Sequence, residues 1–184
     1  MRILVTGTTG GIGGAVGRAA ASAGHEVVAV NRGDFDSFSC GEIDAVVFAS
    51  GICPVKPVTM LTDGELSETF DVNCGLFLRL MRRMLKERMF SRAGAAVVAV
   101  SSVSAVEGWP GGAAYCASKG ALSAACRALD AELAPRKISV RAIEPRYVKT
   151  AMFDRLAGRM GVDPALAVHP DELAAKILEL VEKP

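Results

Sequence analysis

The sequence has little of what marks several large classes of protein. Aromatic residues make up only 5% of its 184 residues, and it contains only two histidines. Its 21 Lys and Arg almost balance its 20 Asp and Glu, which gives a net charge of +1. Binding to nucleic acid or to anionic membranes requires a clear basic excess. We therefore expect no nucleic-acid partner, no membrane partner and no metal site.

Paired cysteines and long apolar runs are missing as well. The cysteines, at positions 40, 53, 74, 116 and 126, are odd in number and form no C-x-x-C pair. Such a pattern is typical of free thiols in a reducing compartment. The best candidate for a membrane span, Ala93 to Val106, is too short and contains three serines. These features predict a cytoplasmic protein.

Apolar runs and helical patterns alternate along the chain and predict its fold. The expected strands are Ile3–Val5, Glu26–Val30, Ala45–Ala49, Val97–Val100 and Ile138–Ile143. The expected helices are Ala15–Ala23, Thr62 to about Phe90, Ala113–Ala134 and a last one from Pro170. Uninterrupted apolar strands separated by helices are typical of a parallel sheet covered on both faces. We expect one α/β domain over residues 1–184, a doubly wound, Rossmann-like sheet in three layers with ligands at the carboxyl ends of the strands.

A glycine-rich turn follows the first predicted strand. Five glycines lie between positions 7 and 14, more than a chain reversal needs. Glycines let backbone N–H groups and a helix N-terminus approach a phosphate closely. The predicted phosphate-binding residues are Gly7, Thr9, Gly11, Ile12 and Gly13.

The second predicted strand ends in Asn31 and Arg32. Folds that bind NAD usually place an acid at this point, whereas an arginine accommodates the 2′-phosphate of NADP. Arg32 therefore favours NADP(H), although Asp34 is a competing ligand for a ribose hydroxyl. An exposed, solvated arginine is the alternative.

Tyr115 and Lys119 are spaced i, i+4, so one helical face presents both side chains. An ammonium close to a phenol favours the phenolate, and such a pair can act as a general acid toward a carbonyl oxygen. Ser102 follows the fourth predicted strand, 13 residues before Tyr115. Ser104 is a second candidate for the same position.

Together the motifs TGTTGGIG, DVNCG, AVSSVSA, YCASK and EPRYVKTAM resemble those of the short-chain dehydrogenase/reductase family. The resemblance implies NAD(P)-dependent reduction of a small carbonyl compound or oxidation of the alcohol. It implies that Tyr115 exchanges the proton, Lys119 binds the nicotinamide ribose and lowers the pKa of Tyr115, and Ser102 bonds the substrate carbonyl. Asn73 would hold a water of the proton relay. Further cofactor contacts are implied for Ser50, Gly51, Val148 and Thr150.

Several segments depart from the family pattern. Only about a dozen residues follow Arg32 before the next strand, so the usual third helix must be missing and a strand there is at best Asp34–Ser39. The family's asparagine in N-N-A-G is lost, and its Pro-Gly is Pro145-Arg146, where Arg146 either binds an acidic substrate or phosphate or points to solvent. The lid, about Ala151 to Val168, is short. The sequence also ends without the family's last strand, which favours a homodimer through the two long helices over a tetramer.

Three other interpretations remain open at this point. A cofactor-binding sensor or scaffold with the same fold would have lost efficient catalysis. An epimerase or dehydratase acting on a nucleotide sugar would need a larger substrate domain. Six basic residues between Arg79 and Arg92, Arg82 and Arg83 among them, would suit docking of an acidic partner such as an acyl carrier protein, or would simply be a solvated helix face.

Overall fold

A computed structural model describes residues 1–35 and 37–182, and the side chains of residues 159 and 160 are outside this description. Five parallel strands form one sheet in the order β2-β1-β3-β4-β5. Their bounds are Arg2–Thr6 (β1), Glu26–Val30 (β2), Ala45–Phe48 (β3), Ala95–Val100 (β4) and Ile138–Ile143 (β5). The strand order reverses between β1 and β3, which is where a doubly wound sheet opens a crevice for ligands.

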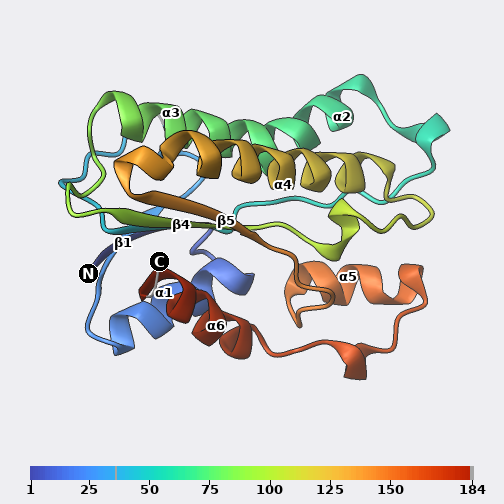
Figure 1. Ribbon diagram of the computed structural model, residues 1–184. Helices are drawn as coiled ribbons and strands as arrows, with labels where there is room; N and C mark the ends of the chain where they lie inside the picture. The colour runs from blue at the N-terminus through green and yellow to red at the C-terminus, as the bar shows by residue number, and fades with distance from the viewer. Residues whose placement is uncertain (36, 183–184) are drawn as a thin grey trace.

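Helices cover both faces of this sheet (Figure 1). On one face lie α1 (Gly11–Ser22) and α6 (Pro170–Glu182), packed against each other. On the other lie α2 (Asp63–Phe70), α3 (Leu76–Lys86) and α4 (Ala113–Leu133). Each face has its own apolar core, and β3 and β4 are buried along their whole length because both faces are covered. The predicted doubly wound, Rossmann-like α/β fold is confirmed.

The segment between β2 and β3 is shorter than a strand and a helix require. As expected, it contains no helix among its described residues. The possible strand Asp34–Ser39 was wrong for the part the structure describes: Asp34, Phe35 and Ser37 form turns, and the two residues after them have no regular secondary structure. Residue 36 lies outside the description. The aromatic rings of Phe35 and Phe38 are instead buried in the core beside α3.

Arg83 on α3 attaches this short segment to the rest of the molecule. Its guanidinium donates hydrogen bonds to the carbonyl oxygens of Phe35 (2.9 Å) and Phe38 (2.7 Å). It also lies over the Phe38 ring, 4.4 Å from the centroid. Arg83 therefore has a structural role, and it is not the freely exposed cation that a docking surface would need.

The long helix predicted from Thr62 to about Phe90 is interrupted and ends earlier than expected. A capping box of Thr62 and Glu65 begins α2, as the sequence predicted. The residues Asp71–Gly75 then form a π-helical turn, after which α3 ends at Lys86. Such π-turns inside helices often occur at functional sites, and this one contains Asn73.

The C-terminal part of the chain adds a short lid. It consists of α5 (Ala151–Met160) and a 3-10 turn, Pro164–Leu166, and it lies beside the carboxyl end of the sheet (Figure 1). The described part of the chain ends with α6 at Glu182. None of the described helices is long and apolar enough to cross a membrane.

Candidate active site

A cavity of about 420 Å³ opens at the carboxyl ends of the strands. Its walls come from the start of α1, the segments that follow β3, β4 and β5, the first turns of α4, and the lid helix α5. Seven predicted site residues line it: Ile12, Gly51, Ser102, Tyr115, Lys119, Val148 and Thr150. Segments far apart in the sequence thus converge on one chamber, as the fold predicts.

Ser102 and Tyr115 face each other in this cavity. Ser102 directly follows the buried strand β4 and caps a short 3-10 turn, where its Oγ accepts a hydrogen bond from the backbone N–H of Ser104 (3.1 Å). Its hydroxyl is also hydrogen-bonded to Tyr115. The hydroxyl of Ser104 instead accepts a bond from the Trp109 indole (3.1 Å). Because Ser104 is engaged by Trp109, the structure favours Ser102 as the partner of the tyrosine.

Burial and the Ser102 hydroxyl act on the pKa of Tyr115 in opposite ways. Burial raises the pKa of the phenol above its ordinary value, and the hydrogen bond from Ser102 lowers it by less. Lys119 lies with its Nζ 5.8 Å from the centroid of the Tyr115 ring. The phenol is therefore protonated at neutral pH, and burial opposes the lowered pKa that the resemblance implied.

Lys119 is almost completely buried, and its Nζ donates a hydrogen bond to the carbonyl oxygen of Val100 at the end of β4 (2.8 Å). Burial lowers the pKa of this ammonium to about 8. Loss of solvent disfavours the charged form of a lysine, so a group with this pKa can change its charge near physiological pH. Such perturbed groups are more frequent at functional sites than elsewhere.

Asn73 positions the loop that passes between Lys119 and the cofactor crevice. Its side-chain amide donates to the carbonyl oxygen of Ile52 (2.9 Å) and to Ser118 Oγ (2.8 Å), and it accepts from the N–H of Ile52 (2.8 Å). A Cβ on Gly51 would lie 3.3 Å from the Asn73 oxygen and 3.4 Å from Lys119 Nζ. The Asn73 side chain is thus committed to contacts within the protein, close to the buried lysine.

The glycine-rich turn fits a pyrophosphate group. A side chain on Gly13 would lie 2.4 Å from the Gly7 carbonyl oxygen, so only glycine allows α1 to approach β1 this closely. Gly10 supplies no side-chain cap, which leaves the first N–H groups of α1 without an intrahelical acceptor. Open space surrounds Gly10, and Thr9 beside it is exposed. An anion at this point would meet donors and the positive end of the helix dipole.

Asn31 and Arg32 lie at the outer end of this crevice. The Asn31 side-chain oxygen accepts bonds from the backbone N–H and the hydroxyl of Thr8 (3.0 and 3.2 Å). The backbone N–H of Asn31 donates to the Asp34 carboxylate (2.9 Å). Arg32 is exposed and forms an ion pair with Glu68 on α2 (2.7 Å). Arg32 is therefore neither free nor pointing only to solvent.

The lost asparagine after β3 is compensated by Thr6 at the end of β1. Thr6 is completely buried, and its Oγ1 accepts hydrogen bonds from the N–H groups of Ala49 and Ser50 and from the Ser50 hydroxyl, all between 3.0 and 3.2 Å. These bonds connect the carboxyl ends of two neighbouring strands. Ser50 is therefore part of the sheet centre and does not line the cavity.

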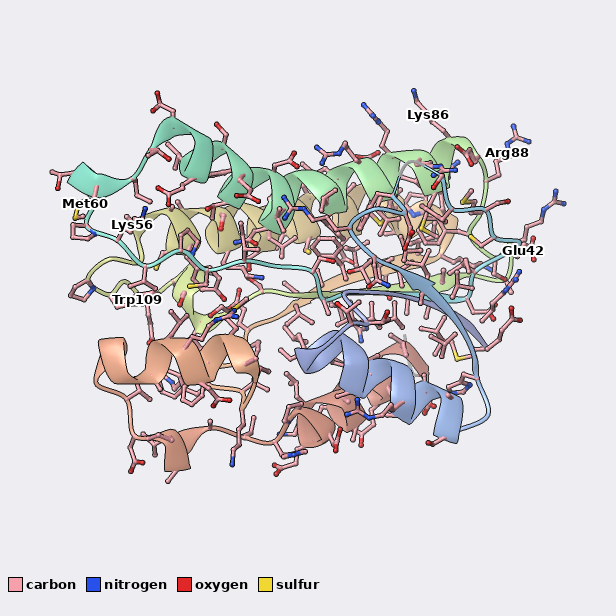
Figure 2. All side chains as sticks on the ribbon, turned by 180° about the vertical axis from the view of Figure 1, so that it is seen from behind. Glu42, Lys56, Met60, Lys86, Arg88 and Trp109 are labelled. Atoms are coloured by element: carbon pink, nitrogen blue, oxygen red, sulfur yellow. The ribbon has the colours of Figure 1, made fainter. Side chains whose placement is uncertain are left out.

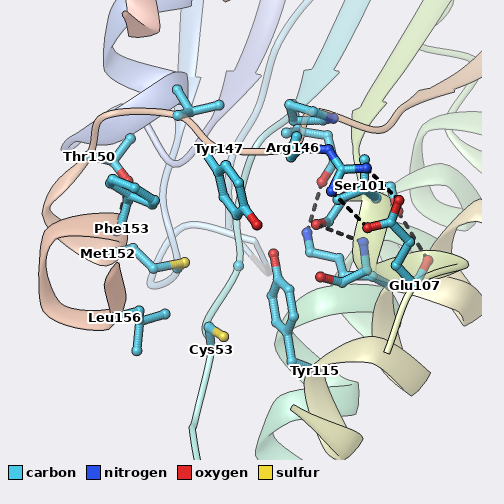
Figure 3. A pocket seen from close by; sticks show the side chains of 18 of the residues that line it. Cys53, Ser101, Glu107, Tyr115, Arg146, Tyr147, Thr150, Met152, Phe153 and Leu156 are labelled. Atoms are coloured by element: carbon cyan, nitrogen blue, oxygen red, sulfur yellow. Dashed lines mark hydrogen bonds and ion pairs between the residues drawn. The ribbon is translucent and has the colours of Figure 1, made fainter. Parts of the chain in front are cut away.

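Several residues of the cavity were not predicted as site residues from the sequence. Glu107 forms an ion pair with Arg146, and Tyr147 stacks on Phe153 with ring centroids 5.7 Å apart (Figure 3). Cys53 also lines the wall, but burial raises the pKa of its thiol to about 12, so it is no nucleophile. The signal for Tyr147 was its place inside EPRYVKTAM. Nothing in the sequence pairs Glu107 with Arg146.

The comparison with protein families matches residues 35–160 of the chain to the model described as "short chain dehydrogenase". The chain belongs to the short-chain dehydrogenase family. Its relatives include the 3-oxoacyl-[acyl-carrier-protein] reductase of Rickettsia felis. The two are 28% identical in an alignment 181 residues long, which covers 83% of this chain and 75% of that protein. The L-xylulose reductase of Bos taurus is 28% identical over 178 residues, which cover 82% and 73%.

Solved structures share the fold of this short-chain dehydrogenase. A family member from Francisella tularensis superposes with a TM-score of 0.86 at 20% identity, over 99% of this chain and 91% of that chain. A 3-ketoacyl-(acyl-carrier-protein) reductase from Brucella melitensis, solved with NADH, gives 0.83 at 22% identity, with 98% and 90% covered. A protein from Beutenbergia cavernae described as a gluconate 5-dehydrogenase, with bound NADP, gives 0.82 at 24% identity, with 98% and 88% covered.

Proposed function

We propose that this short-chain dehydrogenase is an NADP(H)-dependent oxidoreductase that reduces a small carbonyl compound or oxidises the corresponding alcohol. The observation that carries the proposal is the convergence of Ser102, Tyr115 and the buried Lys119 on one cavity beside the glycine-rich turn. The chain is an oxidoreductase by family, and structural neighbours hold either NADH or NADP. Arg32 favours the phosphorylated cofactor.

The residues of the cavity divide the chemistry between them. When bound, the nicotinamide cofactor supplies or accepts the hydride. The Tyr115 hydroxyl donates a proton to the substrate oxygen in the reductive direction, and the raised pKa of its phenol keeps that proton available. The Ser102 hydroxyl bonds the same oxygen and orients it. Lys119 places a positive charge beside the phenolate that remains.

The cofactor end is expected to use the residues around the crevice. Gly7, Thr9, Gly11, Ile12 and Gly13 would hold the pyrophosphate against the start of α1. Asn31 supports this turn, and Arg32 would exchange Glu68 for the 2′-phosphate. Gly51, Val148 and Thr150 would meet the nicotinamide half, with Lys119 on its ribose.

Two measurements test the proposal. Titration with NADPH and NADH, followed by cofactor fluorescence, should show micromolar NADPH binding and weaker NADH binding. Tyr115→Phe should then reduce turnover of a carbonyl substrate at least about a hundredfold, the effect of losing a general acid, while NADPH still binds. Arg82→Gln, an exposed residue of α3 that does not line the cavity, serves as the control and should leave turnover unchanged. Unchanged turnover of Tyr115→Phe would contradict the assigned role.

A catalytically silent cofactor-binding sensor remains the second candidate, because the cofactor side is short and Arg146 stands where the family has glycine. It is favoured if the cofactor binds but no carbonyl compound is reduced. Absence of binding to either dinucleotide would contradict both candidates.

The basic run on α3 does not favour a carrier-docking function. Arg83 is engaged by Phe35 and Phe38, and Lys86 and Arg88 lie at the end of the molecule opposite Trp109, which lines the cavity (Figure 2). We propose a small, free substrate and a homodimer formed through the outer faces of α2, α3 and α4.

A further inference from the structure

Arg146 is the charged group that most distinguishes this cavity. It follows Pro145 in the segment after β5, and its guanidinium donates from Nη1 to Glu107 Oε2 (2.9 Å) and from Nη2 to Glu107 Oε1 (2.5 Å). Two parallel bonds of this kind are the geometry in which arginine recognises a planar carboxylate. Both side chains line the cavity (Figure 3).

The ion pair is built so that it can be exchanged. The side chains of Arg146 and Glu107 are 55% and 49% exposed, and exposed ion pairs contribute little to stability because solvent screens them. The two loops also remain joined without it, because the N–H of Val103 donates to the carbonyl oxygen of Pro145 (3.2 Å). Glu107 can therefore turn toward solvent without separating the segments that follow β4 and β5.

Tyr147 connects Arg146 to the place of reaction. Its hydroxyl acts on the Arg146 guanidinium and adds to the larger effect of Glu107 in raising the pKa of that arginine. In Figure 3 the hydroxyls of Tyr147 and Tyr115 point toward one another. A carboxylate on Arg146 would thus lie close to a carbonyl held by Tyr115.

We infer that Arg146 binds a carboxylate of the substrate in the place that the Glu107 carboxylate takes in this structure, and that the substrate is therefore a short oxo acid. This inference rests on the proposed reductase function and adds the class of substrate. Met152, Phe153 and Leu156 of the lid form an apolar wall of the same cavity, which suits a short hydrocarbon group on the acid. The carboxylate of the substrate replaces that of Glu107 in the two bonds, so the charge beside Arg146 stays balanced.

A binding experiment without cofactor tests this inference separately from catalysis. Trp109, the only tryptophan, lines the cavity, so its fluorescence reports on occupancy. The probes are 4-methyl-2-oxopentanoate and its methyl ester, which differ in the negative charge. We expect the acid to bind the wild-type chain more tightly than the ester. Arg146→Gln should weaken acid binding about tenfold, as expected for loss of bonds to a charged group, and leave the ester unchanged.

Glu107→Gln should have the opposite effect on acid binding, because it removes the carboxylate that competes with the acid for Arg146. It should tighten binding of the acid severalfold and leave the ester unaffected. Arg2→Gln is the matched control, since Arg2 forms an ion pair with Glu26 away from the cavity (2.8 Å). Equal binding of acid and ester to the wild type, or equal losses of both in Arg146→Gln, would overturn the inference.

Turnover measurements then test the substrate class separately from the proposed reductase function. With NADPH present, the wild type should reduce the oxo acid with a lower KM than the ester, and Arg146→Gln should remove the difference. Reduction of the ester with the same KM as the acid would overturn the substrate class but leave the reductase intact. Failure of the chain to bind either dinucleotide would instead contradict the proposed function.

Discussion

Lys119 and Tyr115 are four residues apart on α4, and burial moves their pKa values in opposite directions. Loss of solvent raises the pKa of the phenol and lowers that of the ammonium, because in each case the neutral form is favoured. The sequence predicted their proximity from the i, i+4 spacing. It did not predict that burial would outweigh the attraction between the two groups, since burial depends on the segments that cover α4.

The lowered pKa of Lys119 makes the stability of the fold depend on pH. An unfolded lysine has a pKa of 10.5, and the folded one about 8, so between these values the unfolded state binds more protons. Stability from this group therefore rises as pH increases from about 8 toward 10.5. Relative to Lys119→Met, the free energy of unfolding of the wild type should increase by about 1 kcal/mol between pH 7 and pH 9. Urea denaturation of both proteins at the two pH values measures this; a constant difference would contradict the burial effect.

Under the proposed function, Glu68 influences the preference of the protein for NADPH over NADH. Its carboxylate holds Arg32 and would stand near the negatively charged 2′-phosphate. Glu68→Gln should increase the affinity for NADPH about threefold, the scale of an exposed ion pair, with little effect on NADH. Fluorescence titration checks this, with Glu26→Gln as a control for removing a distant paired acid. An equal change in affinity for both cofactors would show that Arg32 does not recognise the 2′-phosphate.

At the scale of elements, the short connection between β2 and β3 depends on α3. Three interactions of one guanidinium hold Phe35 and Phe38, whose rings fill part of the core. The sequence showed that a helix was missing there. It did not show what replaced the helix, because the partner of the segment is 45 to 48 residues away.

Arg83 and Arg82 offer a matched test of this attachment. Arg83→Gln removes two hydrogen bonds and a cation–π contact, so it should lower the free energy of unfolding by about 1–3 kcal/mol. Arg82 is exposed, and Arg82→Gln should change stability by no more than about 0.5 kcal/mol. Urea denaturation of the two variants is the measurement. Equal stabilities would show that the segment does not need Arg83.

The π-turn at Asp71–Gly75 is a second feature decided at this scale. The apolar pattern from Thr62 onward predicted one uninterrupted helix. Asn73 lies in this π-turn, and its buried side chain forms three hydrogen bonds with Ile52 and Ser118. Those bonds join α4 to the loop after β3, so no local pattern could reveal them.

At the scale of the whole molecule, α2 and α3 carry exposed apolar side chains. Leu66, Phe70 and Leu78 are each between 37% and 44% exposed. The proposed homodimer would bury these side chains between its two copies.

The double substitution Leu66→Glu, Phe70→Glu should therefore convert the proposed homodimer to a monomer. Buried like charges at an interface cost several kcal/mol, more than enough to dissociate a small interface. Light scattering after size-exclusion chromatography measures the mass. Leu166→Glu changes another exposed leucine, 65% exposed in the lid region, and should leave the dimer intact. A wild type that is monomeric throughout would contradict the proposed assembly.

The sequence by itself determined the strand–helix alternation, the parallel sheet, the glycine-rich turn and the candidate set of Ser102, Tyr115 and Lys119. These follow from local composition and spacing, because apolar runs, capping residues and i, i+4 pairs act within a few residues. Only the tertiary structure decided that Arg32 meets Glu68, that Arg83 holds the short segment and that Arg146 meets Glu107. Each of these contacts joins residues 36 or more positions apart, and such pairs exist only once the sheet and its loops have brought them together.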